Sequence, residues 1–337
     1  MRTISNLKTH QDKKLVASIS RNLLILTVIL LISGFLMSCN AASEYSAFPG
    51  ITYIVPHRSV DSLRWSPTDA SKLLVSANNL VQHTAHVYIL DTMTKKKTSL
   101  VDTDYGEVWG IGWSLDGQSV ALSVVGGTEG FEQNGIWLMD TKDKSTELLF
   151  DRTGSILWLP DGKTLAVQTI DFESNQSPRP IAITIVDIQT KVAKLIYSNQ
   201  DAVAFSGFSA SPDGNYLTFS VISDFSTFAT DIFVLELQTG NVKQLTHDKR
   251  SSAPQWSSFG DLIVYQKSYP SNDQAMPSLH LINPDGSCDV AVPIISNTTS
   301  PTWSPDGRKI AFIGEDGIYT LDLDLALGTD IYQDLCS

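Results

Sequence analysis

The sequence predicts an all-β fold made of six repeated units, each with four short antiparallel strands. The first observation is a turn-and-strand pattern, clearest at 301–312 (PTWSPDGRKIAF), where an apolar segment precedes a tight turn and an alternating strand follows. Pro, Asp and Gly occupy the second, third and fourth turn positions, the order that a type I turn favours. The second observation is that the pattern recurs six times at intervals of 45–52 residues. Repetition at this period is typical of β-propeller blades.

Each unit starts at a residue that closes an apolar segment. The six starts are Trp65, Trp113, Trp158, Ala210, Trp256 and Trp303. In five units a glycine follows four positions later, and apolar residues at the seventh and ninth positions have strand periodicity. A further apolar segment ending in Asp, Glu or Asn is followed by a fourth strand, as in 87–91 (VYILD) and 97–101 (KTSLV). We therefore predict a six-bladed β-propeller, with each terminal Asp capping the next turn through its side chain.

The five repeat tryptophans are predicted to pack between blades rather than to bind a ligand. A buried Trp covers about 150–250 Å², so its burial stabilises the fold by roughly 4–6 kcal/mol as an upper estimate. Ala210 replaces Trp in the fourth unit, and Phe208 on the same strand face is expected to compensate for the lost ring.

The last blade must be completed across the chain ends, because an unpaired outer strand is an association hazard. Val55 lies ten residues before Trp65, just as Thr246, the end of an outer strand, lies ten residues before Trp256. An N-terminal strand at 51–55 is therefore predicted to be the fourth strand of the last blade. Residues 329–333 (TDIYQ) are an alternative for the same place.

The repeat resembles that of TolB-like six-bladed β-propellers, in which Trp-Ser-Pro-Asp-Gly hairpins form WD-like repeats and the third strand ends in Asp. The resemblance covers about residues 50–325. The chain departs from it at Leu115, Ala210 and Phe259, and the first unit lacks the glycine. TolB-like propellers serve as envelope docking modules, so the resemblance implies a binding role, although a shared fold does not fix function.

Residues 1–38 have the layout of a bacterial lipoprotein signal peptide. Five basic residues precede or begin an apolar run that ends at Leu36. The run of about 15 residues would span roughly 22 Å as a helix, short of the hydrocarbon core of about 30 Å, so a transmembrane helix is the weaker interpretation. The run ends in Leu36-Met37-Ser38-Cys39, which resembles a lipobox. An ordinary signal peptide with an incidental cysteine is the alternative.

The signal would export the chain, and lipidation of Cys39 would anchor it to a bacterial membrane, facing the periplasm or the cell surface. Several acyl chains on one residue give the stable anchoring that a single chain does not. Residues 39–49 would then be a tether, and residues 50–337 the propeller. We expect a monomer that meets the membrane through its lipid only.

The charge of the chain argues against nucleic acid and anionic lipid as partners. The formal net charge is -12, and residues 1–38 hold five Lys and Arg but one acid, so their removal leaves about -16. Binding to phosphates needs clustered cations. The one run of three basic residues after the leader, 95–97, is predicted to be a solvated turn. Export permits a disulfide between Cys288 and Cys336, but the sequence does not decide whether it forms.

The candidate binding surface is the rim on which the six units differ most. Turns between strands one and two, and between three and four, are short and share one rim, here called the regular rim. The loops between strands two and three, with the blade-to-blade connections, form the irregular rim. These loops are 77–86, 125–135, 170–180, 222–230 and 267–278. Irregular loops on a rigid scaffold commonly carry binding. The candidate contacts are Tyr105, Trp109, Phe131, Phe172, Phe225 and Tyr269.

No catalytic residue, metal or cofactor is predicted. The sequence has no G-x-S-x-G motif. His83 and His86 would present two imidazoles but lack an evident third ligand, and 102–107 lacks the ligand spacing of a calcium loop.

The favoured function is a non-catalytic, lipid-anchored propeller of the cell envelope that binds a protein, peptide or glycan. One alternative is a propeller-type polysaccharide lyase or hydrolase. Another is an accessory subunit of a separate peptidase or transporter. Converging His, Arg and carboxylate groups at the channel mouth would favour the enzyme, whereas an apolar aromatic patch would favour the docking module.

Overall fold

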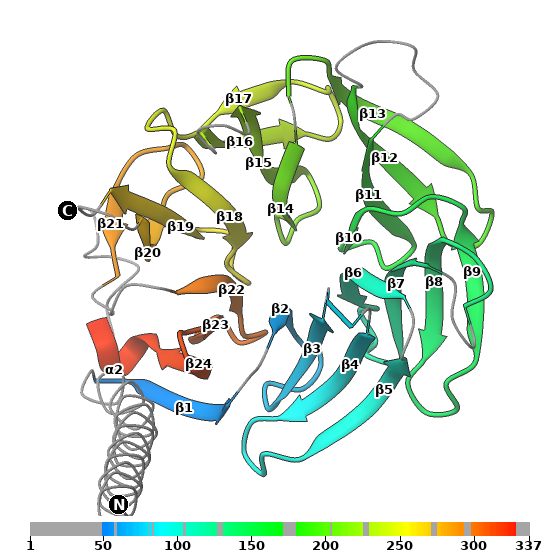
Figure 1. Ribbon diagram of the computed structural model, residues 1–337. Coiled ribbons are helices and arrows are strands. Elements are labelled where there is room, and N and C mark those ends of the chain that lie inside the picture. The colour runs from blue at the N-terminus through cyan, green and yellow to red at the C-terminus, as the bar shows by residue number, and fades with distance from the viewer. Residues whose placement is uncertain are drawn as a thin grey trace, which may run out of the picture.

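Six four-stranded antiparallel sheets surround a central axis like the blades of a propeller (Figure 1). The computed structural model describes residues 49–56, 59–79, 81–82, 84–103, 106–126, 131–170, 180–202, 204–224, 229–270, 275–292 and 298–327. The predicted fold class, a six-bladed β-propeller, is confirmed.

The blades follow one another along the chain, and the first strand of each is the innermost. Blade 1 holds β2 (Val60–Trp65), β3 (Lys72–Asn79), β4 (Thr84–Asp91) and β5 (Lys97–Thr103). Blade 2 holds β6 (Glu107–Trp113), β7 (Ser119–Val125), β8 (Gly135–Asp140) and β9 (Thr146–Phe150). Blade 3 holds β10 (Ser155–Trp158), β11 (Thr164–Ile170), β12 (Ile181–Asp187) and β13 (Ala193–Asn199).

The second half of the ring repeats this order. Blade 4 holds β14 (Ala204–Ala210), β15 (Tyr216–Asp224), β16 (Ala229–Glu236) and β17 (Val242–Gln244). Blade 5 holds β18 (Ser251–Trp256), β19 (Ile263–Pro270), β20 (Ala275–Ile282) and β21 (Asp289–Ala291). Blade 6 holds β22 (Thr299–Trp303), β23 (Lys309–Ile313) and β24 (Gly317–Asp322), and a short helix, α2 (Leu323–Leu327), follows it.

The N-terminal strand closes the ring. β1 (Ile51–Pro56) pairs antiparallel with β24 as the outer strand of blade 6, with Ile51 opposite Leu321. The ring of Tyr53 meets Tyr319 edge-on at 5.3 Å between centroids. The predicted closing strand is thus confirmed, and the alternative at 329–333 lies outside the described residues.

The turn between the first and second strands of blade 6 is held by a serine. In blade 6 the Gly307 amide donates to the Ser304 carbonyl oxygen at 2.9 Å. The Ser304 hydroxyl donates to Asp306 at 2.6 Å and accepts from the Lys309 amide at 2.9 Å. Gly307 has a φ of 68°, and the Phe259 ring lies so close that a Cβ there would clash. Hydroxyl, carboxylate and glycine therefore have separate roles in this turn.

The Asp at the end of the third strand caps the next turn, as predicted. Asp91 Oδ1 accepts hydrogen bonds from the amides of Met93 at 3.0 Å and Thr94 at 2.7 Å. Asp140 and Asp187 do the same in blades 2 and 3. The hydrogen bonds from Thr190 and Gln189 lower the pKa of Asp187. These carboxylates are therefore structural.

All five repeat tryptophans are buried and join neighbouring blades. Their exposed fractions are 6–8%. Trp113 Nε1 donates to the Arg64 carbonyl oxygen of blade 1 at 3.2 Å, and Trp303 Nε1 donates to that of Gln255 in blade 5 at 3.1 Å. Where Ala210 interrupts the series, Phe208 is 1% exposed and lies in the core cluster that includes Ala210. The predicted packing role is confirmed.

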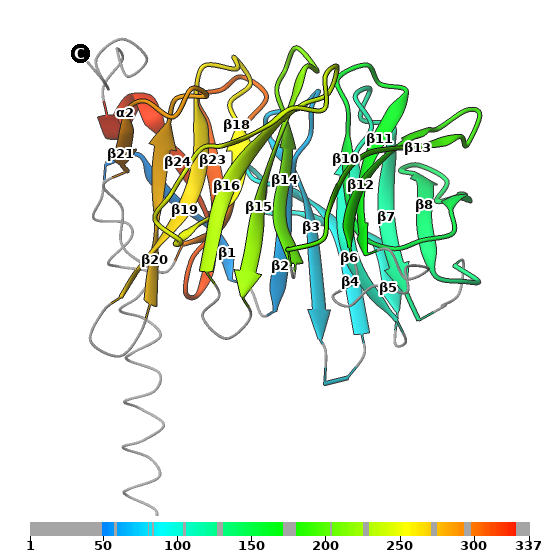
Figure 2. The same cartoon turned by 90° about the horizontal axis from the view of Figure 1, so that it is seen from above.

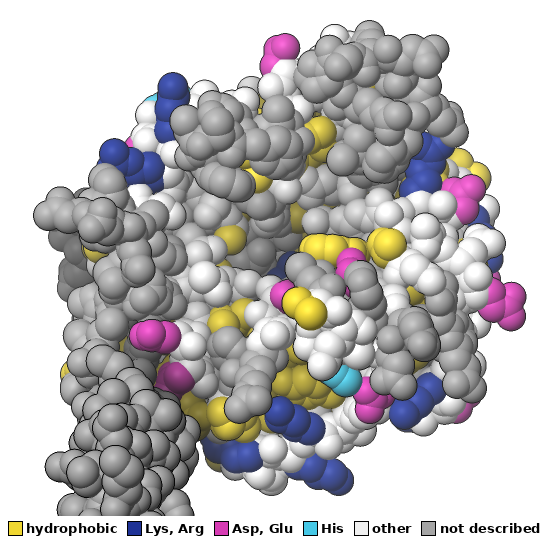
Figure 3. Space-filling model, in the orientation of Figure 1, with side chains coloured by type: hydrophobic (Ala, Val, Ile, Leu, Met, Phe, Trp, Pro, Cys, Tyr) yellow, Lys and Arg dark blue, Asp and Glu magenta, His cyan; other side chains and the backbone are white. Residues whose placement is uncertain are grey.

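The two rims differ as expected. Figure 2 shows the connections between second and third strands, such as that between β3 and β4, on one side of the ring and the short turns on the other. The irregular rim faces the reader in Figures 1 and 3. Within the ranges described above, no helix is long and apolar enough to cross a membrane.

Candidate functional site

Trp109 is an exposed aromatic residue on a rigid support at the irregular rim. It lies near the start of β6, at a bulge that shifts the register of pairing with β7 between Val108 and Gly110. The Val108 amide donates to Asn78 Oδ1 at 2.9 Å, and Asn78 Nδ2 donates to the Val108 carbonyl oxygen at 2.9 Å. Trp109 itself is 55% exposed. Bulges commonly redirect a side chain in this way, so Trp109 suits the predicted contact role.

The other predicted contacts are placed differently. Phe131 is 2% exposed and meets Trp137 edge-on at 5.5 Å, so its ring belongs to the core of blade 2 and does not face a partner. Tyr269 lies in β19 opposite Met276. Tyr105, Phe172, Phe225 and the predicted lipidation site Cys39 lie outside the described residues.

Cys288 is disulfide-bonded. The only other cysteines of the sequence are Cys39 and Cys336, and both lie outside the described residues. The bridge between Cys288 and Cys336 therefore stays a prediction.

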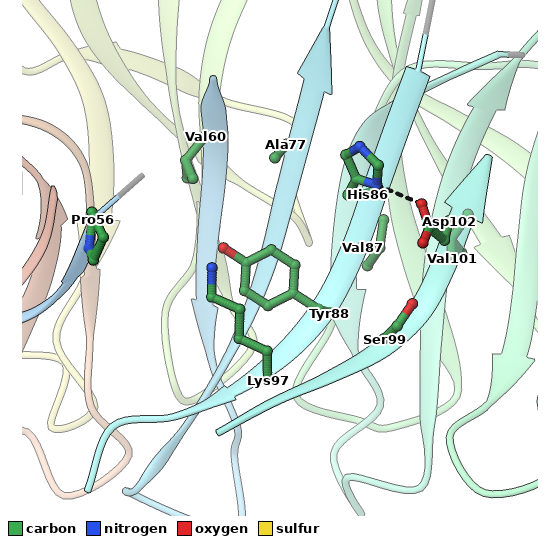
Figure 4. Close-up of a pocket in the computed structure, with 10 residues that line it drawn as sticks. All are labelled: Pro56, Val60, Ala77, His86, Val87, Tyr88, Lys97, Ser99, Val101 and Asp102. Carbon is green, nitrogen blue, oxygen red and sulfur yellow. Dashed lines mark hydrogen bonds and ion pairs between the residues drawn. The ribbon is translucent and has the colours of Figure 1, made fainter. Parts of the chain in front are cut away.

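A groove of about 350 Å³ lies where the ring closes, between β1 of blade 6 and the face of blade 1 (Figure 4). Its lining residues come from β1 to β5, and together they define what we call the seam groove. They are Pro56, Val60, Ala77, His86, Val87, Tyr88, Lys97, Ser99, Val101 and Asp102. Its volume lies in the range of small-ligand and side-chain sites.

The seam groove combines an apolar floor with several polar groups. His86 Nδ1 lies 2.7 Å from Asp102 Oδ1, and both side chains are at least half exposed. With Nδ1–H donating to Asp102, the other ring nitrogen, Nε2, is left for a second partner. The Lys97 ammonium lies 4.8 Å from the centroid of the Tyr88 ring. Burial raises the pKa of Tyr88 to about 12, so its hydroxyl stays protonated and can donate.

Antiparallel register explains why these residues meet. β4 pairs with β5 so that His86 is opposite Asp102 and Tyr88 is opposite Ser99. Two of these residues stand out in the sequence for other reasons. His86 forms half of a two-imidazole motif with His83, and Asp102 begins a loose calcium motif. His83 lies outside the described residues. The alternation of Lys97 and Ser99 along β5 is a signal in the sequence that could have indicated part of this shared face.

Two further grooves lie between blades, beside turns of the regular rim. One, of about 570 Å³, lies between blades 3 and 4 and includes Val192 and Leu237. The other, of about 390 Å³, lies between blades 4 and 5 and includes Tyr216 and Trp256. Neither holds the combination of imidazole, phenol and ammonium that lines the seam groove.

A second set of charged groups, in blade 5, is internally paired. Lys267 Nζ lies 2.9 Å from Asp248 and 2.8 Å from Asp289. The Tyr265 hydroxyl donates to Asp289 at 2.7 Å, and His280 Nδ1 lies 2.7 Å from the same carboxylate. Burial opposes the ionised form of Asp289, but the hydrogen bonds from these three partners hold its pKa well below its usual range. The network therefore satisfies buried polar groups of the blade.

In the part of the chain that the structure describes, no group of three His, Cys, Asp or Glu side chains could hold a metal ion.

Comparison with known proteins agrees with the fold. The family model described as the TolB beta propeller domain matches residues 56–305. The chain belongs to the TolB β-propeller family. Its similar proteins include the Tol-Pal system protein TolB of Francisella tularensis subsp. mediasiatica, 27% identical over 225 residues, which cover 65% of this chain and 49% of the relative. The counterpart from subsp. holarctica matches at the same identity and coverage. The chain thus spans about half the length of these relatives.

Solved structures with a similar fold include proteins named TolB and a lyase. A putative TolB from Agrobacterium tumefaciens matches with a TM-score of 0.59 at 21% identity, covering 81% of this chain and 96% of the other. TolB from Acinetobacter baumannii matches with a TM-score of 0.58 at 16% identity, covering 76% and 64%. Oligogalacturonate lyase from Vibrio parahaemolyticus matches with a TM-score of 0.57 at 14% identity, covering 84% and 94%. At these identities the likeness shows the fold alone.

Proposed function

We propose that the chain is a non-catalytic docking protein of the cell envelope, which binds a protein partner through its irregular rim. The observation that carries the proposal is the family match over residues 56–305, together with relatives named as Tol-Pal system proteins. The exposed Trp109 supplies an aromatic contact at the irregular rim, and the seam groove supplies a polar recess along the face of blade 1. Aromatic residues of this kind commonly anchor protein interfaces.

We also propose that a lipid on the N-terminal part of the chain anchors the propeller to a membrane. Export by the signal at 1–38 and lipidation of Cys39 would hold the propeller at a membrane surface, where an envelope partner is within reach.

Affinity capture tests the docking role. The full-length tagged chain is expressed in its own envelope, extracted in mild detergent and analysed by quantitative mass spectrometry. We expect an envelope protein that is enriched with the wild type and depleted with Trp109→Ala. Phe259→Ala is the matched control, because Phe259 is a 64% exposed aromatic residue on the regular rim. Equal recovery from both variants and the wild type would count against the irregular rim, and recovery of no envelope protein would count against docking.

A further inference from the structure

The seam groove carries a cationic edge in an otherwise acidic protein. The chain has a formal net charge of -12. Lys95, Lys96 and Lys97 are its only run of three cationic residues, and all three are exposed in the turn that begins β5. Figure 3 shows Lys and Arg side chains gathered along the lower edge of the molecule, beside apolar side chains. The three lysines therefore form a local positive patch that attracts negative groups, on a protein whose net negative charge otherwise repels them.

In the described part of the chain, these ammonium groups have no carboxylate partner. Lys97 lies over the ring of Tyr88, and Lys95 Nζ reaches only the carbonyl oxygen of Tyr53, at 3.5 Å. Among the residues that the structure describes, no carboxylate forms an ion pair with any of the three lysines. Some other lysines do form ion pairs: Lys191 is 2.6 Å from Glu147, and Lys72 is 2.8 Å from Asp69. The cationic edge is thus open to an external anion.

The groove beside this edge offers apolar contacts. Val60, Ala77 and Val101 line it together with the buried face of Tyr88. Figure 4 shows Pro56 on β1 across the groove from Tyr88 and Lys97, with His86 and Asp102 farther along β4 and β5. A ligand lying along the groove would meet apolar side chains first and the ammonium of Lys97 at one end.

We propose that the seam groove binds an extended acidic peptide segment of the protein partner, with an apolar side chain on the groove floor and a neighbouring carboxylate on Lys97. This inference rests on the proposed docking function and identifies the chemistry of the partner. The Tyr88 hydroxyl and the solvent-facing nitrogen of His86 supply further hydrogen-bonding groups along the peptide. Charge complementarity of this type sets specificity and the rate of encounter.

The test uses synthetic fluorescent peptides as probes, because the partner sequence is not needed. Binding to the full-length protein is measured by fluorescence anisotropy with peptides of alternating Glu and Leu, Gln and Leu, or Lys and Leu. We expect the Glu peptide to bind at least about tenfold more tightly than the Gln peptide, with affinity that falls as salt rises. Equal affinity for the Glu and Gln peptides would overturn the proposal.

Two variants locate the site. Lys97→Glu should weaken binding of the Glu peptide by about tenfold or more. Lys142→Glu is the matched control, since Lys142 is exposed in the corresponding turn of blade 2 and makes the same charge change. Ser99→Trp fills the groove from the exposed side of β5 and should abolish binding without lowering the melting temperature. Equal effects of Lys97→Glu and Lys142→Glu would mean a general charge effect and overturn the site.

The outcome separates this inference from the docking function. If the envelope partner is captured equally by the wild type, Lys97→Glu and Ser99→Trp, the docking function stands and the seam groove is not its peptide site. If the Glu peptide binds in the groove but no envelope protein is captured, the chemistry of the groove stands and the docking function fails.

Discussion

Replacing Trp113 with Ala should destabilise the propeller far more than replacing Trp109, four residues away on the same strand. Trp113 is 7% exposed, belongs to a core cluster of blades 1 and 2, and donates Nε1–H to the Arg64 carbonyl oxygen at 3.2 Å. Truncation of a buried Trp costs about 3–5 kcal/mol through lost burial and the cavity left behind. At about 2 °C per kcal/mol for a chain of this size, the melting temperature should fall by roughly 6–10 °C.

Two further variants divide this effect into its parts. Trp113→Phe keeps a ring but loses the donor to Arg64, so it should cost about 1–3 kcal/mol. Trp109→Ala removes a ring that is 55% exposed and should stay within about 0.5 kcal/mol of the wild type. Urea unfolding followed by circular dichroism measures all three. The reasoning is refuted if Trp109→Ala destabilises as much as Trp113→Ala, or if Trp113→Ala leaves stability unchanged.

Two other predictions concern the stability of the fold at low pH and the anchoring of the chain to a membrane. Hydrogen bonds from Lys72 and Ser71 lower the pKa of Asp69 from 3.8 to about 2, so its stabilising effect should be complete above about pH 4 and disappear as the pH falls through 2. The stability difference between the wild type and Asp69→Asn should therefore shrink as the pH falls from about 4 to 2. A difference that stays constant over this range would contradict the prediction. Solvent screening keeps the effect small, because the Asp69 side chain is 36% exposed. Cys39→Ser should release the exported chain from washed membranes into the soluble fraction, and persistent membrane association would contradict lipidation.

The fold was predictable because its determinants are local and repeated. Period-two apolar residues predict strands, and Ser-Pro-Asp-Gly predicts the turns in which Ser304, Asp306 and Gly307 make the expected hydrogen bonds. Even the long-range closure by β1 was predictable, since the spacing from Val55 to Trp65 copies that between an outer strand and the next blade. Departures such as Ala210 did not disturb it, because Phe208 lies in the same cluster.

The candidate site was predictable only in part. Trp109 is an aromatic residue near the start of β6 at the irregular rim, and the bulge exposes it. Phe131 is also an aromatic residue of the predicted irregular rim, but its ring packs against Trp137, a contact that the sequence pattern does not reveal. The seam groove requires side chains from β1 to β5, and its pairing of His86 with Asp102 depends on strand register and a bulge in β5. Residue patterns alone do not specify such register.

Site-specific photo-crosslinking in the native envelope tests the central claim, that a protein partner docks on the irregular rim, most directly. A benzophenone amino acid is placed at Trp109, and in a separate variant at Phe259 on the regular rim, both of which are exposed aromatic positions. We predict a covalent adduct with an envelope protein from position 109 and none from position 259. An adduct from position 259 alone, or from neither position, would contradict the account.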